Sequence, residues 1–285
     1  MHTTTTGEST GSAPRAEDAA RRANARLVKR LRNQVAKASK LYHLLEPGDR
    51  ILCGLSGGKD SYAMMWLLRE VRRKAPFDFT MVGVNLDQGH PGFQQQVIAD
   101  WCDEEGFEHH MIQRDTYSVV KEKIPEGRTF CSLCSRLRRG ILYTTAIELG
   151  CNKIALGHHR DDTIETLMLN LFFSGQLKAM PPRLTSDDGR NVVIRPLIRC
   201  AEEEIEQLAR IREFPILPCD LCGSQENLQR QQIKRMLGEW NDRNPKVKGN
   251  LFAALGNVRA SHLLDPELRR LAQVDDLRQD DESVL

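Results

Sequence analysis

The chain has 285 residues, of which 40% are hydrophobic and 28% are charged, and its formal net charge is +2. These proportions are ordinary for a globular protein. No uninterrupted apolar run approaches the ~20 residues that cross a bilayer, which excludes a membrane-spanning protein, and we expect no membrane partner. The N-terminus also lacks the apolar segment of a secretory signal, so we expect a cytoplasmic protein.

The N-terminal region combines a polar tail with a basic helix. Residues 1–23 are rich in Thr, Ser, Gly and Ala, and we expect them to be disordered. A helix is predicted from about Asn24 to Leu45, because apolar residues recur there at helical spacing. Residues 21–45 contain eight Arg and Lys and no acidic residue. Such a stripe is either a solvated helix face or a contact for a polyanion.

A glycine turn joins the first predicted strand, residues 48–55, to a helix over residues 60–73. Glycines let backbone N–H groups approach an anion, and the start of the next helix adds donors and partial positive charge. Lys59 adds a cation and Asp60 can hold Mg²⁺, whereas a tight turn by itself needs neither charge. The turn is therefore predicted to bind a phosphate chain with a metal through Ser56, Gly57, Gly58, Lys59, Asp60 and Ser61.

Strands and helices continue to alternate after this turn. The pattern predicts an α/β fold with a doubly wound, mainly parallel sheet. In such sheets, ligands bind beyond the carboxyl ends of the strands. Further strands are predicted at residues 79–87, 108–114, 152–159 and 191–198, and further helices at 93–106, 135–150, 161–173 and 201–214.

Four of the eight cysteines form two CxxC pairs, Cys131 with Cys134 and Cys219 with Cys222. A reducing compartment does not sustain structural disulfides, whereas this spacing lets two sulfurs face one metal or cluster. The first pair is predicted to lie in a loop just before the helix that begins near Ser135, where the helix N-terminus favours thiolates. Spacing alone leaves a structural zinc, an iron–sulfur cluster and a redox dithiol open, with zinc slightly ahead.

The last part of the chain is predicted to be helical, at residues 224–243 and 247–258. We therefore expect an extension of the α/β unit rather than a separate second domain. The predicted segments are a disordered tail (1–23), an α/β domain that begins with the basic helix (24–214), a cysteine-containing helical extension (215–262) and an acidic tail (263–285).

Five motifs, in this order along the chain, resemble those of the tRNA 2-thiocytidine synthetases (TtcA type), a branch of the PP-loop ATP pyrophosphatases. The resemblance spans roughly residues 25–260 and implies a Rossmann-like PP-loop fold that cleaves ATP between its α and β phosphates. The motifs are SGGKDS from Ser56, CSLCSRLRRGILY from Cys131, ALGHHRDD from Ala155, MPPRL from Met180 and PCDLCGSQENLQR from Pro218.

The same resemblance implies a [4Fe–4S] cluster with three cysteine ligands, Cys131, Cys134 and Cys222, and one iron free to hold sulfur. Cys219 also fits the spacing, so the sequence itself allows a fourth ligand.

The motif GHHRDD follows a predicted strand and opens a helix, which places it beside the glycine turn. His158 or His159 is interpreted as a phosphate or acid–base group, and Asp161 and Asp162 as Mg²⁺ or base-orienting groups. In the alternative interpretation the aspartates cap the helix and the histidines are loop residues. Asp87 ends the second strand, where it either faces the ribose or base of the nucleotide or only terminates the strand. With Lys59 and Asp60, these are the candidate catalytic and nucleotide-binding residues.

The reaction implied by the resemblance is the ATP-dependent 2-thiolation of cytidine 32 in the tRNA anticodon loop, through an O-adenylated base. The implied partners are a cysteine desulfurase as sulfur donor and a second copy of the chain in a homodimer. The basic RLRRG segment and the N-terminal stripe fit a tRNA substrate.

Two other functions remain open from the sequence. One is a PP-loop thiolase that acts on another tRNA position, such as a uridine. The other is a non-catalytic protein that binds ATP and RNA and holds a structural Cys₄ zinc.

Overall fold

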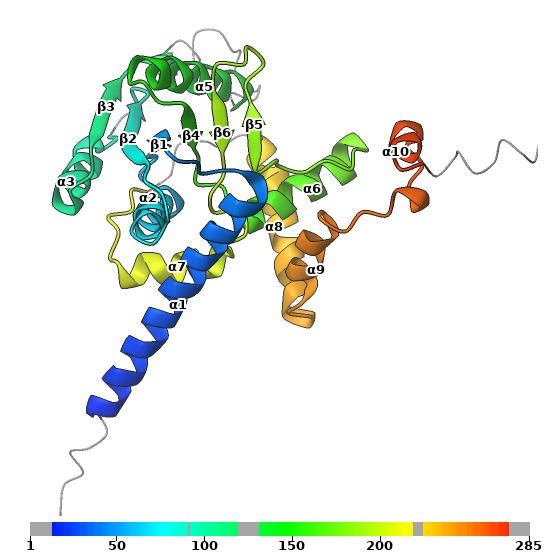
Figure 1. The fold of residues 1–285 in the computed structure, drawn as a ribbon, viewed down its shortest axis with the longest axis horizontal. Helices are drawn as coiled ribbons and strands as arrows, with labels where there is room; N and C mark the ends of the chain where they lie inside the picture. Colours follow the sequence, from blue (N-terminus) through cyan, green and yellow to red (C-terminus); the bar gives the residue numbers. More distant parts are fainter. Residues whose placement is uncertain (1–12, 91, 119–130, 219–224, 274–285) are drawn as a thin grey trace, which may run out of the picture. The chain divides into compact units, whose positions relative to one another are not determined.

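The computed structural model describes residues 13–90, 92–118, 131–218 and 225–273. The chain divides into two compact units, residues 1–234 and 235–285. All of the described strands belong to the first unit, and the described part of the second unit is helical (Figure 1). Among the described residues, no helix combines the length and the apolar character that a bilayer crossing needs.

The first unit is built on a six-stranded sheet with the order β3-β2-β1-β4-β6-β5. Five strands are parallel and β5 runs antiparallel to β6, which confirms the predicted mainly parallel sheet. The short strand β5 was not predicted, because three residues are too few to show a periodic pattern; all three are exposed. The strands are β1 (Arg50–Gly54), β2 (Thr80–Asp87), β3 (His109–Gln113), β4 (Lys153–Ala155), β5 (Arg183–Thr185) and β6 (Val192–Ile194).

Helices connect the parallel strands, and further helices precede the first strand and follow the last strand along the chain. In the first unit they are α1 (Ala13–Tyr42), α2 (Lys59–Arg72), α3 (Gln95–Glu105), α5 (Cys131–Glu148), α6 (Arg160–Ser174) and α7 (Glu202–Ile211). Helix α8 (Gln225–Arg243) crosses from the first unit into the second, which also contains α9 (Val247–Ala254), the 3₁₀ turn η1 (Ala260–His262) and α10 (Pro266–Leu271).

Two helices begin earlier than the sequence predicted. Helix α1 begins at Ala13 rather than near Asn24, because the apolar periodicity used for the prediction begins only at the buried Leu27, while residues 17–26 are exposed. Helix α5 begins at Cys131, so the first CxxC pair lies in its first turn. The prediction of a loop at this pair was wrong, because CSLC contains no helix-breaking Gly or Pro.

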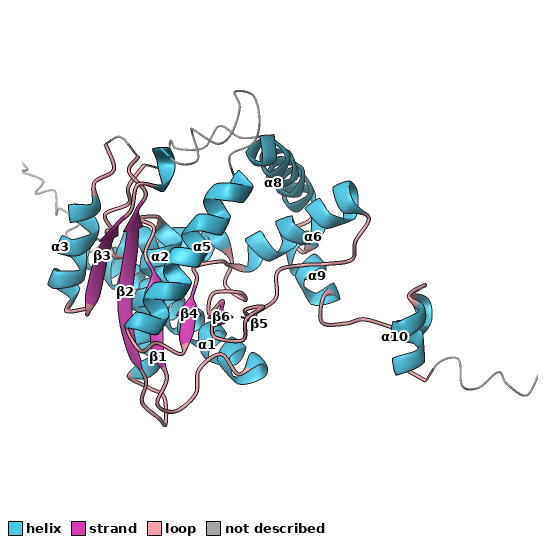
Figure 2. Ribbon diagram, turned by 90° about the horizontal axis from the view of Figure 1, so that it is seen from above, coloured by secondary structure: helices cyan, strands magenta, loops and turns pink. Residues whose placement is uncertain are grey.

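The sheet is covered on both faces, as in a doubly wound fold. Leu52, Val82 and Val84 pack with Leu142 of α5 in one buried cluster. On the other face, a Cβ atom at Gly83 would lie only 3.2 Å from the sulfur of Met65 in α2, so this glycine lets helix and strand approach closely. Figure 2 shows α5 beside β2 and β4.

Candidate active site

The glycine turn lies at the carboxyl end of β1, where it leads into α2. Gly57 has a φ of +81°, which a residue with a side chain rarely adopts. Ser61 Oγ donates to Gly58 O over 2.8 Å, and Gly58 N donates to Ser56 Oγ over 3.3 Å, so the turn holds its own shape. Gly58 gives α2 no side-chain cap, which leaves the first amides of the helix suited to a phosphate.

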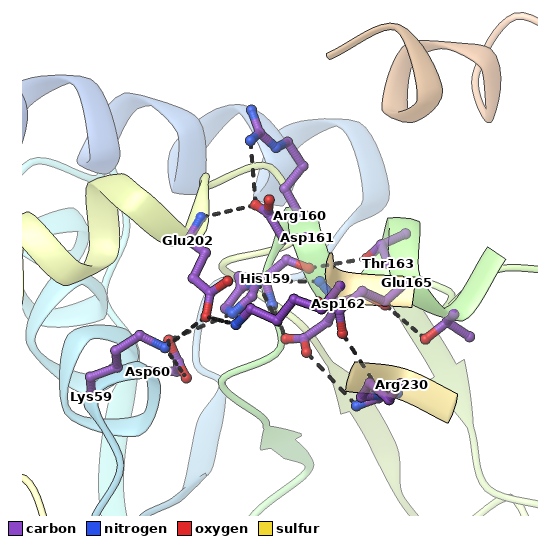
Figure 3. Close-up of polar contacts among 12 residues, drawn as sticks. Lys59, Asp60, His159, Arg160, Asp161, Asp162, Thr163, Glu165, Glu202 and Arg230 are labelled. Carbon is purple, nitrogen blue, oxygen red and sulfur yellow. Dashed lines mark hydrogen bonds and ion pairs between the residues drawn. The ribbon is translucent and has the colours of Figure 1, made fainter. Parts of the chain in front are cut away.

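Lys59 lies in a group of alternating charges. Its Nζ atom is 3.3 Å from an Asp60 carboxylate oxygen and 3.2 Å from Glu202 Oε1, at the start of α7 (Figure 3). Although burial opposes the charged ammonium, the two acids raise the pKa of Lys59. Burial raises the pKa of Asp60, against the charges of His159 and Lys59. The ammonium is thus positive at neutral pH and is held by side chains that a phosphate chain could replace.

Glu202 also receives a second cation. Lys234 Nζ, from α8, lies 2.8 Å from the same Glu202 Oε1 atom that Lys59 contacts. Although burial disfavours its charged form, the Lys234 contact and nearby positive charges lower the pKa of Glu202. Because both ammonium groups touch one oxygen, they lie within about 6 Å of each other, a spacing at which one anion can contact both.

His159 and Asp162 form a capping box at the start of α6. Asp162 N donates to His159 Nδ1 over 3.3 Å, and His159 N donates to Asp162 Oδ2 over 3.0 Å. His159 Nε2 is 3.8 Å from Asp60 Oδ1, which ties this cap to the glycine turn. Asp162 therefore makes the helix-capping contact that the alternative interpretation of the GHHRDD motif expects.

Asp161 fixes the start of another helix. The residue is 3% exposed, and its Oδ2 atom accepts from the backbone N–H of Glu202 over 2.9 Å and lies 3.3 Å from Arg160 Nη2 (Figure 3). Asp161 therefore holds the start of α7, whose first residue is Glu202. A catalytic or metal-binding role for Asp161 or Asp162 stays a prediction.

His158 occupies the same edge of the sheet in a half-buried position. Burial lowers the pKa of its imidazole to about 4; Asp162 opposes this, whereas Arg195 and Arg230 act in the same direction. The ring is therefore neutral at pH 7, in which form it can donate one hydrogen bond and accept another.

Asp87 is at the same carboxyl edge, at the end of β2. Its side chain is buried, and Oδ1 accepts from Gly89 N over 2.8 Å, while Gln113 Nε2 donates to Oδ2 over 3.4 Å. These contacts hold the turn that follows the strand. The predicted nucleotide contact of Asp87 stays a prediction.

The first cysteine pair, and the described chain just before the second pair, lie at this edge. Helix α5 runs back along the sheet before β4, so its first residue, Cys131, is at the carboxyl edge. Leu217 N donates to Gly57 O over 2.9 Å, which brings the chain onto the glycine turn two residues before Cys219. Cys219 and Cys222 themselves lie outside the described residues, and α8 begins three residues after Cys222.

Sequence reasoning missed several residues that build the site. Glu202 was read only as part of a helix, although three consecutive glutamates that follow a strand could have suggested a role. Gly157 was not singled out, yet a Cβ atom there would lie 3.0 Å from the Asp60 backbone carbonyl. Lys234 comes from a helix distant in sequence and lies outside the five motifs. Arg230, near Asp162 and Glu165, is the last residue of the motif PCDLCGSQENLQR, which gave it a signal, but it was not singled out.

Comparison with known proteins agrees with this geometry. A family model described as a PP-loop domain matches residues 26–239. The tRNA-cytidine(32) 2-sulfurtransferase of Hahella chejuensis is 56% identical over 85% of this chain and 85% of its own length. That of Sorangium cellulosum is 57% identical over 85% of this chain and 86% of its own.

The chain belongs to the PP-loop family of tRNA-cytidine(32) 2-sulfurtransferases. This confirms the family resemblance found in the sequence. A solved structure of the U34-tRNA thiolase NcsA from Methanococcus maripaludis, with its [4Fe-4S] cluster, aligns with a TM-score of 0.65. The alignment covers 82% of this chain and 79% of that chain at 23% sequence identity, and it shows that the two proteins share a fold.

Proposed function

We propose that this chain is a tRNA-cytidine(32) 2-sulfurtransferase, which uses ATP to replace the 2-oxo group of a tRNA cytidine with sulfur. The observation that carries the proposal is the identity of about 56% over most of the chain to proteins of that name. The geometry supports it, because the glycine turn lies at the edge of the sheet to which both CxxC segments lead. A phosphate-binding turn without thiols would fit ATP use but not sulfur transfer.

ATP would bind with its phosphates on the glycine turn. Residues Ser56–Ser61 supply backbone and hydroxyl donors, Lys59 supplies a cation, and Lys234 supplies a second cation from α8. The cytosine O2 atom attacks the α-phosphorus, a P–O bond forms, and the α–β bridging bond breaks to release pyrophosphate. The two ammonium groups stabilise the charge that develops on the leaving pyrophosphate.

The acidic and imidazole groups complete this site. Asp60 is placed to hold a Mg²⁺ ion on the phosphates, since its carboxylate is beside Lys59 at the start of α2. Neutral His158 can hydrogen-bond the base or its developing adenylate without competing with Lys59 for a proton. Asp161 acts on the site through Glu202, whose amide it holds.

The cysteines suit an iron–sulfur cluster, because such clusters are bound by cysteine thiolates. Each pair also lies close, along the chain, to a described segment at the site. Cys131, Cys134 and Cys222 would hold the cluster. When bound, a [4Fe–4S] cluster would hold, at its iron without a cysteine ligand, the sulfide that replaces AMP at C2 of the base. We further propose that a cysteine desulfurase provides this sulfur as a persulfide, which a thiol reductant converts to sulfide, that the target base is in the anticodon loop, and that the chain works as a homodimer.

The test is product analysis with protein purified and handled without oxygen. Wild type, ATP, Mg²⁺, sulfide and unmodified tRNA should yield 2-thiocytidine in digested tRNA, measured by mass spectrometry, while Lys59→Met should form at least about 100-fold less. Formation of 2-thiouridine instead would indicate a uridine thiolase. Bound zinc without iron, together with no thiolated base, would indicate the non-catalytic alternative.

A further inference from the structure

The long helix α1 carries a charge pattern that the active site does not use. Its buried face holds Leu27, Leu31 and Val35, which are at most 4% exposed. Its outer face carries exposed Arg22, Arg26, Lys29, Arg30 and Lys37, and between residues 21 and 45 there is no acidic residue. A shallow groove along the helix is lined by Arg26, Lys29, Arg30, Asn33, Gln34 and Lys37.

The contacts of α1 fix its direction relative to the sheet. Just after its last turn, Glu46 contacts Lys153 at the start of β4, which is the amino edge of the sheet. Further toward its N-terminus, Arg30 pairs with Glu204 and Gln34 donates to the same carboxylate over 3.2 Å. Glu204 is in the first turn of α7, whose first residue, Glu202, contacts Lys59. Helix α1 therefore runs from the active-site edge to the opposite edge.

The part of α1 before Arg30 consequently projects past the active-site edge. At 1.5 Å per residue, the helix continues for about 25 Å from Arg30 to Ala13. Figure 1 shows this end extending away from α2 and α7. All side chains of residues 17–26 are exposed, so the first unit does not cover them.

We infer that the outer face of α1, Arg22, Arg26, Lys29 and Lys37, is a docking surface for the sugar–phosphate backbone of the substrate RNA. The inference rests on the proposed function, because it takes the base handled beside Lys59 to belong to a folded tRNA. A row of cations that repeats about once per helical turn suits a polyanion much longer than ATP. An RNA whose target base enters the site must continue past this edge of the sheet, where the row lies.

A membrane surface is a poorer partner for this helix. Helices that bind in a lipid interface present large apolar side chains opposite their basic face. The apolar face of α1 is buried against the first unit, and from residue 17 to residue 40 no large apolar side chain is exposed. The available interaction is therefore electrostatic. Contacts of this kind position the RNA backbone but do not recognise its bases.

The test compares tRNA affinity at several salt concentrations. The variant Arg22→Gln/Arg26→Gln/Lys29→Gln should raise the Kd for an unmodified tRNA transcript at least about tenfold at 100 mM salt. It should also lower the slope of log Kd against log salt by about 2 to 3. ATP affinity should not change. The control variant Arg73→Gln/Lys74→Gln/Arg190→Gln removes the same charge from exposed positions at the opposite edge and should keep the wild-type Kd.

Two further measurements make the result decisive. A variant with Arg22→Lys and Arg26→Lys keeps the charges and should retain wild-type affinity; loss of affinity there would overturn an electrostatic role. Equal weakening of tRNA binding by the control variant would also overturn it. So would an Arg22→Gln/Arg26→Gln/Lys29→Gln variant that binds tRNA as wild type does but no longer binds vesicles of 70% phosphatidylcholine and 30% phosphatidylglycerol. If wild type makes 2-thiocytidine but the α1 variant binds tRNA as wild type does, only this inference fails. If wild type thiolates no tRNA, the proposed function fails.

Discussion

A single carboxylate, Glu202, organises the cations beside the glycine turn. It holds Lys59 and Lys234 through the same oxygen, and its backbone amide is held by Asp161. Only Lys59 belongs to the turn, while Lys234 comes from α8. Through Glu202, Lys234 therefore links the glycine turn to the helix that follows the second cysteine pair.

Replacing Lys234 should weaken ATP binding without abolishing it. The side chain is 55% exposed, so solvent screens its charge, and we expect Lys234→Met to raise the Kd for ATP by about three- to tenfold. Isothermal titration calorimetry measures this directly. The matched control is Lys246→Met, an exposed lysine in the second unit, which should leave the Kd unchanged. Equal affinities for wild type and Lys234→Met would contradict a role in phosphate binding.

Glu165 should make stability depend on pH. Burial raises the pKa of its carboxyl to about 7; Asp162 adds to this and Arg230 opposes it. Because the pKa of Glu165 is higher in the folded than in the unfolded state, the folded state holds this proton at a pH where the unfolded state has lost it. The resulting contribution to the free energy of unfolding is complete below about pH 4.5 and is lost as the pH rises toward 7. Glu165→Gln should remove this loss.

The free energy of unfolding of wild type and of Glu165→Gln should be measured from pH 5 to pH 8. The variant should gain on wild type as the pH rises, by at most about 3 kcal/mol, as followed by urea denaturation. A difference that shrinks with rising pH would show that Glu165 is stabilised in its charged form instead.

At the scale of elements, the loop after β4 packs against the start of α2. A Cβ atom at Gly157 would lie 3.0 Å from the carbonyl carbon and oxygen of Asp60 and 3.1 Å from Ser61 N. These neighbours are backbone atoms, so they cannot rotate away as a side chain would. The absence of a side chain at Gly157 therefore sets how closely the GHHRDD motif approaches the glycine turn.

Gly157→Ala should accordingly displace the turn. We expect thiolation to fall at least about tenfold and the unfolding free energy to fall by about 1–3 kcal/mol. Gly140→Ala is the matched control, because Gly140 is exposed in α5 with no neighbouring atom within 4 Å of its Cβ position. That change should keep activity and add up to about 1 kcal/mol of stability. Single-turnover rates and thermal unfolding measure both effects.

At the scale of the whole first unit, the candidate active site and a buried ion pair lie at opposite edges of the sheet. The amino edge holds a buried ion pair, in which Lys153 Nζ lies 2.8 Å from Asp49 Oδ2. Both side chains are 2% exposed, and Asn152 also donates to Asp49 over 2.7 Å. These contacts tie β4 to the segment that precedes β1.

Lys153→Met should leave a buried carboxylate without its cation and cost about 3–5 kcal/mol of unfolding free energy. Because the pair is far from the glycine turn, ATP affinity at low temperature should stay as in wild type. Urea denaturation and calorimetry separate these two quantities. A loss below 1 kcal/mol would mean that Asp49 becomes neutral or rehydrated in the variant.

The sequence predicted the parts of this protein that depend on local pattern. The alternation of buried strands and helices indicated the mainly parallel sheet, and SGGKDS indicated a tight turn that leads into a helix, because glycine conformation and helix start are properties of adjacent residues. The start of α5 was mispredicted for a related reason: local sequence allowed a helix at CSLC without requiring one.

What the sequence by itself determined was thus the order of elements, the turn chemistry and, through five motifs, the family. Only the tertiary structure decided that Glu202 joins Lys59 to Lys234, that Asp161 holds the start of α7, and that α1 projects past the active-site edge. These facts depend on contacts between residues far apart in the chain. Such contacts follow from how the whole sheet and its helices pack, which no local pattern of residues encodes.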